Sequence, residues 1–481
     1  MELTLWEAAK ACNGQLCHGA KVWSQENIED AKAQEWAGVK LTQVVIDSRK
    51  VIKGGLFIAT KGERVDGHSF IPQVAEKGAA GVVCEVAPQN CEVPYILVKD
   101  SFVALKQIAE YYRLEHLKHL KVVGITGSVG KTSTKEFVAS VLAVKYKVLK
   151  TEGNYNNEVG LPLTVLSIRK EHEVAVLEMG ISEFGEMHRL SKAARPDYCL
   201  ITNIGQCHLE NLKSRDGILK AKTEIFDYMK EDGTVCLNGD DDKLITVDKV
   251  KGKEPILFSK SNEKMKVYAS HIKSRGLFGS FCRICTPIGE FETQVPLPGE
   301  HMVQNACAAT CMGLELGLTL EEIDEGIRKV PAVNGRSNII RLKDYTLIDD
   351  CYNANPVSMR SAIDLLKTAD TRTVAVLGDM FELGEDEVNM HAGIGAYAVE
   401  NKVDVLICVG NLSKHMYEAA IRIIQAKGQE AGNEEITTKC YYFATREELL
   451  TGYKELIQSG DTILIKASHG MGFAAVVEDL S

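Results

Sequence analysis

A glycine-rich segment gives the sequence its strongest chemical signal. It reads Gly124-Ile-Thr-Gly-Ser-Val-Gly-Lys-Thr-Ser133, begins within the apolar run 121–126 and leads into a predicted helix over 130–145. Glycines let backbone N–H groups close around phosphate oxygens, a helix N-terminus adds partial positive charge, and Lys131 adds a full charge. The Thr132 hydroxyl is a suitable oxygen ligand for Mg²⁺. The segment is therefore predicted to bind phosphate.

The spacing departs from the strict phosphate-binding loop. That motif requires glycine five residues before Gly130, where this chain has Ile125, so the match is to a shorter variant, Thr-Gly-Ser-x-Gly-Lys-Thr. A chance glycine-rich turn is the alternative, but Gly-Lys-Thr after a buried strand favours a phosphate loop. The residues expected to contact nucleotide phosphates are Gly127, Ser128, Gly130, Lys131, Thr132 and Ser133.

Two further polar residues follow predicted strands. Glu178 lies near the end of the run 174–180, and His208 follows the run 197–205. The carboxyl ends of parallel strands meet at one edge of a sheet, so both are expected beside the phosphate loop. Each alone is more simply a solvated glutamate or a hydrogen-bonded histidine, but together they are candidate ligands of Mg²⁺, directly or through water. Lys222, judged by spacing alone, is a solvated helix lysine.

Composition limits the class of protein. The 481 residues carry 56 Lys and Arg against 66 Asp and Glu, a net charge of −10, and 45% of residues are hydrophobic. These values are typical of a globular protein and exclude a disordered chain, a collagen or a coiled-coil rod. An acidic chain is a poor counterion for a phosphate backbone, so no nucleic acid partner is expected. No uncharged apolar run approaches the ~18 residues of a membrane span, so no membrane insertion is expected.

Cysteine usage predicts the compartment. The 14 cysteines are scattered, and the first residues show neither the basic nor the apolar segment of a signal peptide. We therefore expect reduced thiols in a cytoplasmic protein. The single CxxC pair, Cys282 and Cys285, has no second pair or nearby histidines, so a zinc site is not expected.

The length of the chain and the pattern of predicted strands and helices along it predict an α/β protein of three domains. Residues 1–101 form a small α/β domain. Residues 102–332 alternate strands and helices, as in a mostly parallel sheet covered on both faces, with a β insertion at 255–298. Residues 333–481 alternate as in a doubly wound, Rossmann-like domain. The predicted strands are 44–47, 56–60, 81–85, 95–100, 121–126, 174–180, 197–205, 346–350, 373–378, 403–409, 440–444 and 461–466. The predicted helices are one before Gly78, then 103–119, 130–145, 301–316, 320–329, 356–367, 390–400, 414–426 and 446–458.

Several long motifs resemble the Mur ligases of peptidoglycan synthesis. The central ones are TGSVGKTSTKE (126–136), EGNYNNEVGLPLTVL (152–166), LEMGISEFGEM (177–187), NIGQCHLENL (203–212) and AKTEIF (221–226). Three others resemble the members that add D-alanyl-D-alanine to UDP-MurNAc-tripeptide: DSRKVIKGGLFIATKGERVDGHSFI (47–71), DDCYNANPVSM (349–359) and LGDMFELGE (377–385). The resemblance runs from about residue 41 to the end of the chain.

The resemblance implies an architecture and a reaction. The N-terminal domain would bind the UDP-sugar and the central domain would bind ATP. The C-terminal domain would be the Rossmann-like ligase domain. ATP and Mg²⁺ would be the cofactors, UDP-MurNAc-tripeptide and D-Ala-D-Ala the substrates, and the protein a monomer. The tripeptide carboxylate would take the γ-phosphate as an acyl phosphate, and the amine of D-Ala-D-Ala would then displace phosphate. Catalysis would consist mainly of positioning anionic groups and neutralising their charge.

The resemblance also assigns roles by position. Lys131 would contact the β/γ phosphates, Thr132 would bind the first Mg²⁺, and Glu178 and His208 would lie at the second. Lys222 matches the lysine that the family carbamylates, which would make it an anionic ligand. The remaining nucleotide and metal-region contacts would come from Asn156, Asn157, Asn305, Arg336 and Asp350, with Asn305 at the adenine.

Other matches concern the substrates. Tyr352, Asn353 and Asn355 would shape the interdomain cleft or the dipeptide pocket, although turn formation and helix capping before Pro356 explain the two asparagines equally well. Ser48 and Arg49, with Lys61 a weaker candidate, would contact the UDP-sugar, a surface turn being the alternative. In KASHGMGF (466–473), His469 stands where the family usually has arginine, so the role of His469 is left open.

Two other classes of protein compete with this interpretation. Another ATP-dependent amide ligase on the same scaffold, such as a folylpolyglutamate synthase, would keep the phosphate loop but lack the first ~100 residues as a separate domain. A non-catalytic nucleotide-binding protein would need the phosphate loop but not Glu178, His208 and Lys222 together.

Overall fold

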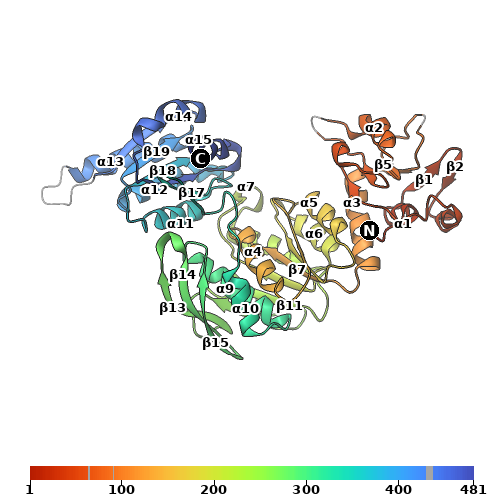
Figure 1. Cartoon of the computed structure of the whole chain (residues 1–481), viewed down its shortest axis with the longest axis horizontal. Coiled ribbons are helices and arrows are strands. Elements are labelled where there is room, and N and C mark those ends of the chain that lie inside the picture. Colours follow the sequence, from red (N-terminus) through yellow and green to blue (C-terminus); the bar gives the residue numbers. More distant parts are fainter. Residues whose placement is uncertain (63–64, 90, 429–436) are drawn as a thin grey trace.

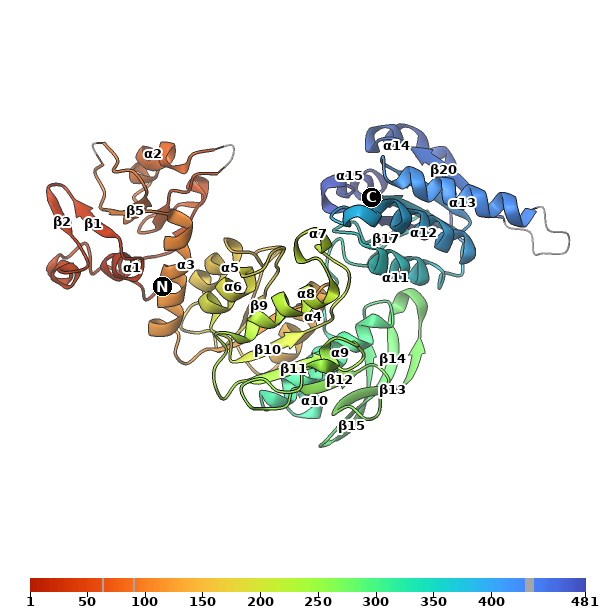
Figure 2. The same ribbon diagram turned by 180° about the vertical axis from the view of Figure 1, so that it is seen from behind.

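Three α/β domains follow one another along the chain in a computed structural model that describes residues 1–62, 65–89, 91–428 and 437–481. The central domain lies between the other two, which form opposite ends of an extended molecule (Figures 1 and 2). Each domain has its own sheet. The predicted α/β class and three-domain architecture are therefore confirmed, whereas the boundaries after residues 101 and 332 stay predictions.

The N-terminal sheet has the order β2-β1-β6-β5-β4-β3. The four predicted strands are present as its parallel part, and β1 and β2, which the sequence did not indicate, add an antiparallel edge. The strands are β1 (Gln15–His18), β2 (Lys21–Trp23), β3 (Val44–Val45), β4 (Leu56–Ile58), β5 (Gly81–Cys84) and β6 (Tyr95–Leu97); the α-helices are α1 (Leu5–Ala11) and α2 (Ile71–Glu76). Residues 63 and 64 of the motif 47–71 lie outside the described residues.

The central sheet has the order β15-β14-β13-β12-β11-β10-β7-β9-β8. Its strands are β7 (Lys121–Thr126), β8 (Val148–Lys150), β9 (Val174–Glu178), β10 (Tyr198–Ile201), β11 (Thr234–Asn238), β12 (Ile256–Ser259), β13 (Val267–Ser274), β14 (Ser280–Thr286) and β15 (Gly289–Val295). The helices are α3 (Ser101–His116), α4 (Lys131–Leu142), α5 (Gly160–Ser167), α6 (Glu186–Ala194), α7 (Leu209–Leu212), α8 (Arg215–Thr223), α9 (His301–Glu315) and α10 (Leu320–Arg328).

The predicted β insertion is present, but it continues the central sheet instead of standing apart. Strands β12 and β13 pair in parallel, and β14 and β15 then extend the same sheet antiparallel. Strand β7 shows why the sheet is covered on both faces. Val122 packs into one hydrophobic core, while Val123 and Ile125 pack into the other, because successive side chains alternate between faces. Burying each contributes roughly 1.5–3 kcal/mol relative to exposure.

The C-terminal sheet has the order β16-β17-β21-β18-β19-β20, parallel except for β16. Its strands are β16 (Asn338–Arg341), β17 (Thr346–Asp349), β18 (Thr373–Gly378), β19 (Val405–Val409), β20 (Lys439–Phe443) and β21 (Thr462–Lys466). The helices are α11 (Pro356–Leu366), α12 (Glu387–Glu400), α13 (Ser413–Gly428), α14 (Arg446–Gly452) and α15 (Ala474–Leu480). The strand–helix alternation predicted for this region is confirmed, with helix ends displaced by a few residues.

Candidate active site

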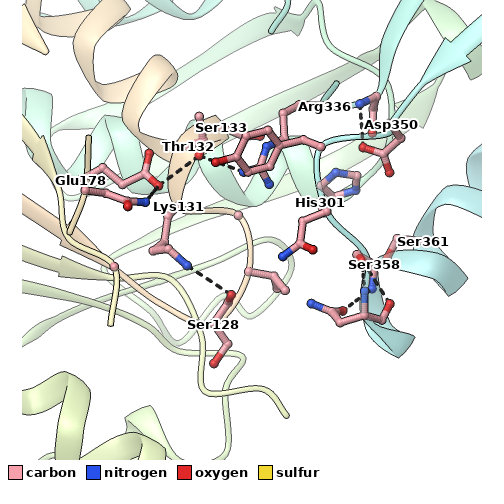
Figure 3. A pocket seen from close by; sticks show the side chains of 18 of the residues that line it. Ser128, Lys131, Thr132, Ser133, Glu178, His301, Arg336, Asp350, Ser358 and Ser361 are labelled. Carbon is pink, nitrogen blue, oxygen red and sulfur yellow. Dashed lines mark hydrogen bonds between the residues drawn. The ribbon is translucent and has the colours of Figure 1, made fainter. Parts of the chain in front are cut away.

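The phosphate loop connects β7 to α4, as the sequence predicted. Gly130 precedes the helix in a left-handed conformation with φ 79°, and a side chain at Gly127 would collide with Thr202, whose Oγ1 lies 1.9 Å from the Cβ position. Both positions therefore require glycine. Lys131 begins the helix, and its amine donates to the carbonyl oxygen of Gly127 at 2.9 Å. It also donates to the carbonyl oxygen of Ser128 at 3.3 Å (Figure 3). The loop thus holds the lysine over the position expected for phosphates.

A buried polar network joins this loop to the end of β9. The Glu178 Oε1 atom accepts hydrogen bonds from Thr132 Oγ1 at 3.1 Å and Asn156 Nδ2 at 2.8 Å. Glu178 is only 1% exposed, and its Oε2 atom is buried without a hydrogen-bond partner in the described part of the chain. The amine of Lys135, a buried lysine on α4, lies 4.0 Å from Oε2. An unsatisfied buried carboxylate oxygen is costly, so this geometry is suited to a cation.

The C-terminal domain forms the opposite wall (Figure 3). Arg336 Nη2 donates to Thr132 Oγ1 at 3.3 Å, and the guanidinium carbon lies 4.0 Å from the centroid of the Tyr352 ring. Asp350 Oδ1 accepts from the Ser337 backbone N–H, while its Oδ2 pairs with the buried Lys466 amine at 2.6 Å. Arg336 therefore reaches the phosphate loop itself and links the two domains at the site.

These elements enclose a cleft of about 390 Å³ between the central and C-terminal domains. It collects most of the residues predicted for the nucleotide, the metal and the dipeptide. The predicted residues that line the cleft are Ser128, Gly130, Lys131, Thr132, Ser133, Asn156, Asn157, Glu178, His208, Arg336, Asp350, Tyr352, Asn353 and Asn355. The structure thus gathers residues that lie more than 200 positions apart in the sequence, although their individual roles stay predictions.

Lys222 is buried, whereas its spacing in the sequence suggested a solvated lysine. It lies on α8 and is 1% exposed. Burial lowers the pKa of Lys222 to about 7, with a further lowering by the positive charge of Lys131. Burial also lowers the pKa of His208, the largest opposing influence being Glu382, whose Oε2 lies 2.9 Å from His208 Nδ1. Both predicted metal-site residues therefore favour their neutral forms more than in water.

Six predicted residues do not line the cleft: Lys222, described above, and Gly127, Asn305, Ser48, Arg49 and Lys61. Asn305 is buried on α9, where its Oδ1 accepts from Thr134 Oγ1 at 3.0 Å. Three others lie in the N-terminal domain. Ser48 is buried and its carbonyl accepts from Lys77, Arg49 pairs with Asp47, and the backbone of Lys61 forms an isolated antiparallel β-bridge with that of Asp66. Their expected contacts to adenine and UDP-sugar stay predictions. Gly127 belongs to the phosphate loop and packs against Thr202.

Of the two asparagines before Pro356, Asn355 acts as a helix cap, an alternative that the sequence left open. The Asn355 side chain accepts from the Ser358 backbone N–H at 2.9 Å at the start of α11, which confirms the capping interpretation for this residue. Asn353 accepts through its backbone carbonyl from Lys466 at 2.9 Å. Asn157 accepts from the backbone N–H of Gly160 at 2.8 Å and so stabilises the first turn of α5.

Sequence reasoning missed several residues of the site. Lys466 belongs to the KASHGMGF motif, yet its pairing with Asp350 depends on β21 lying beside β17. His301 lines the cleft at the start of α9, and burial lowers its pKa. His469, whose role the sequence left open, lies beside Tyr352, with ring centroids 5.5 Å apart and the rings tilted by 41°. For Lys466, the only signal in the sequence was its position in the motif KASHGMGF.

The oxygen donors fit a magnesium ion. Mg²⁺ prefers carboxylate, hydroxyl and phosphate oxygens and keeps several waters, so few protein ligands suffice. Thr132 supplies a hydroxyl, and Glu178 supplies the carboxylate whose Oε2 is unpartnered in the described part of the chain. Among the described residues, no group of three or more His, Cys, Asp or Glu is arranged to hold a metal ion. Within the same residues, no helix has the length and apolar character needed to cross a membrane.

The fold and the cleft define a class of protein. It is a three-domain protein with a phosphate loop, in which the central domain and a Rossmann-like C-terminal domain form the two walls of the cleft. Family comparisons agree. The Mur ligase family catalytic domain matches residues 40–113, the Mur ligase middle domain residues 125–313, and the Mur ligase glutamate ligase domain residues 335–469.

Relatives extend this over the whole chain. The UDP-N-acetylmuramoyl-tripeptide–D-alanyl-D-alanine ligase of Bacillus subtilis is 36% identical over 91% of this chain and 92% of its own length. A crystal structure of MurF from Acinetobacter baumannii superposes with a TM-score of 0.85 at 32% identity, covering 99% of this chain and 98% of that one. MurF of Thermotoga maritima in complex with ADP gives a TM-score of 0.77 at 27% identity, covering 91% and 96%. The chain belongs to the Mur ligase family.

Proposed function

We propose that the chain ligates D-alanyl-D-alanine to UDP-MurNAc-tripeptide at the expense of ATP, giving UDP-MurNAc-pentapeptide, ADP and phosphate. Ligases with that name match it over more than nine-tenths of both chains. The observation that carries the proposal is the cleft in which the phosphate loop, Glu178 and the C-terminal Arg336 meet. Such a cleft can bind ATP phosphates on one wall and present a second substrate from the other.

The first step activates the carboxylate. A carboxylate oxygen of the tripeptide attacks the γ-phosphorus, the bond to the β–γ bridging oxygen breaks, and ADP leaves. Lys131 neutralises charge at the phosphates from the central wall, and Arg336 does so from the C-terminal wall. The resulting acyl phosphate has phosphate as a good leaving group, which a free carboxylate lacks.

The second step forms the amide. The neutral amine of D-Ala-D-Ala attacks the acyl carbon, a tetrahedral intermediate collapses, and inorganic phosphate leaves with the original carboxylate oxygen. Tyr352 and the backbone around Asn353 and Asn355 line the C-terminal side of the cleft, where we place the dipeptide. The wall must orient the amine, because positioning supplies much of the rate gain in such two-substrate reactions.

We further propose that Mg²⁺ is the metal cofactor. Thr132 and Glu178 would hold it, with His208 and a carbamylated Lys222 as further contacts, and the ion would supply charge neutralisation at the phosphates. Asn156 would keep Glu178 oriented through the 2.8 Å hydrogen bond. The adenine would lie near Asn305.

The other end of the substrate would bind the N-terminal domain. Ser48 and Arg49, with Lys61, are the proposed contacts to the UDP-sugar diphosphate. Arg49 is exposed and already holds a bidentate contact with Asp47, at 2.9 and 2.8 Å, so it would exchange partners on binding. UDP-MurNAc-tripeptide would thus extend from the N-terminal domain to the cleft beside the phosphate loop. We also propose a monomeric enzyme of the cytoplasm, where ATP and reduced thiols are available.

The test is an omission experiment. Purified protein is supplied with ATP, Mg²⁺, UDP-MurNAc-tripeptide and D-Ala-D-Ala, and each component is left out in turn while phosphate release and product mass are measured. We expect release only with all four, and a product heavier by one dipeptide less one water. Release that ignores D-Ala-D-Ala would indicate another amine acceptor, and ATP binding without turnover would support a non-catalytic nucleotide-binding protein.

A further inference from the structure

One contact crosses the cleft without using any residue of the phosphate loop. Nδ1 of His208, in the central domain, lies 2.9 Å from Oε2 of Glu382, in the C-terminal domain. His208 lines the nucleotide cleft and immediately precedes helix α7, which faces the C-terminal domain in both views (Figures 1 and 2). The two residues are 174 positions apart, so the contact exists only while the two domains stand close together.

The loop that carries Glu382 is fixed to its own domain by buried hydrogen bonds. It follows β18, where the Asp379 carboxylate accepts from the backbone N–H and hydroxyl of Ser413, both at 2.7 Å. The next backbone N–H groups, those of Met380 and Phe381, donate to the buried side chains of His391 and Ser468, both at 2.9 Å. A loop anchored at each residue before Glu382 moves with its domain and presents the carboxylate at a defined point.

Both partners have backbones that non-glycine residues seldom adopt. Glu382 has φ 62° and His208 has φ 51°. Left-handed conformations of such residues are retained where the surrounding structure enforces them, and they cluster at functional sites. Here they bring an imidazole and a carboxylate together across a domain boundary, although the Glu382 side chain is otherwise 65% exposed.

We propose that Glu382 is a positioning residue for the ligation: its carboxylate, brought in by the C-terminal domain, accepts a hydrogen bond from Nδ1–H of His208 and so fixes the ring's tautomer and orientation. Nε2 is then the lone-pair nitrogen of a ring that lines the cleft. A carboxylate that accepts from the far nitrogen is one common way in which a histidine is oriented toward a metal. The site would thus be complete only when the domains are closed.

The tautomer can be measured without turnover. Two-bond ¹H–¹⁵N spectra of the full-length, ¹⁵N-histidine-labelled protein with ADP report which nitrogen of each ring carries the proton, and His208→Gln assigns the signal. We expect His208 to carry its proton on Nδ1 in the native protein and in Glu382→Gln, whose amide oxygen still accepts. In Glu382→Ala we expect a return to the Nε2–H form that predominates in water. Glu385→Ala is the matched control, since Glu385 is an exposed carboxylate of the same loop with no ion pair among the described residues. An unchanged His208 tautomer in Glu382→Ala would overturn the proposal.

Kinetics supply a second readout, and this one alone rests on the proposed ligation. Glu382→Ala should lower kcat by about 10- to 100-fold, in the range of other residues that orient ligating histidines, with the unfolding midpoint unchanged. Glu382→Gly keeps the left-handed backbone without strain and should lose as much, which separates the carboxylate from the loop conformation. In a His208→Gln background, Glu382→Ala should add no further loss. An additive loss there would show that Glu382 acts on something other than His208 and would overturn the proposal. Absence of ligation in the native protein would refute the proposed function but would leave the tautomer result standing.

Discussion

Lys222, the buried lysine on α8, gives a prediction whose magnitude follows from its surroundings. Lys222 is 1% exposed, and its pKa is lowered from an ordinary 10.5 to about 7, first by burial and then by the charge of Lys131. The difference of about 3.5 between the two pKa values corresponds to at most about 5 kcal/mol of destabilisation while the lysine is fully charged in the unfolded chain. In the uncarbamylated, metal-free protein, unfolding between pH 7 and 10.5 takes up a proton at Lys222. Stability should therefore rise with pH across that window and lose this dependence below pH 7.

The assay is denaturant unfolding in CO₂-free, metal-free buffer at pH 7 and pH 9.5, comparing the native protein with Lys222→Met. The native protein should gain stability relative to the variant as the pH rises, by up to about 3 kcal/mol over these 2.5 pH units. Lys220→Met, which removes an exposed lysine from the same helix, should track the native protein at both values. A stability difference between the native protein and Lys222→Met that does not change with pH would refute the reasoning.

The same lowered pKa makes carbamylation chemically accessible. At pH 7.5 about three quarters of an amine with pKa about 7 is neutral, against about one part in a thousand for an ordinary lysine, and only the neutral amine attacks CO₂. With ¹³C-bicarbonate and Mg²⁺, the native protein should therefore show a carbamate carbon signal that Lys222→Met lacks and Lys220→Met keeps. Equal signals in the native protein and Lys222→Met would assign the carbamate elsewhere.

Three further predictions follow from the cleft and its two walls. Glu178→Gln keeps the hydrogen bond from Thr132 but removes the charge, so the Mg²⁺ concentration for half-maximal activity should rise at least tenfold; an unchanged magnesium titration would contradict the placement of the metal. Asn355→Ala removes a helix cap and should cost about 1 kcal/mol in the free energy of unfolding, measured by urea denaturation; a raised KM for D-Ala-D-Ala with full stability would instead make it a dipeptide contact. ATP and UDP-MurNAc-tripeptide together should decrease the radius of gyration in small-angle scattering, because the proposed substrate contacts are distributed over all three domains. No change with both ligands would remove the closure hypothesis.

Local signals in the sequence were enough to place the centre of the site. Gly130 and Lys131 stand in a motif that needs only a strand before it and a helix after it, and both are present. Glu178 follows from the parallel arrangement, because β9 and β10 flank β7 and end at the same edge. The short strand β8 was not predicted because it gives no such local signal. It has three half-buried residues, too few to show an alternating pattern.

The remaining features depend on tertiary structure, which one sequence does not encode locally. Lys222 looked like a solvated lysine because burial is decided by the elements around α8, not by its neighbours in sequence. The pairs between Arg336 and Thr132 and between Glu382 and His208 join separate domains, and no spacing rule links residues 174 or more positions apart. The resemblance to a family supplied candidates for several of these residues, but not the contact made by Glu382.

The most direct test of the central claim is the fate of the carboxylate oxygens during ligation. UDP-MurNAc-tripeptide labelled with ¹⁸O in its terminal carboxylate is converted with ATP and D-Ala-D-Ala, and the inorganic phosphate is examined by mass spectrometry or ³¹P NMR. An acyl-phosphate route transfers one labelled oxygen from the carboxylate to each phosphate released and leaves the other in the new amide. Phosphate that contains no ¹⁸O, with the labelled pentapeptide still formed, would contradict the proposed chemistry of the cleft.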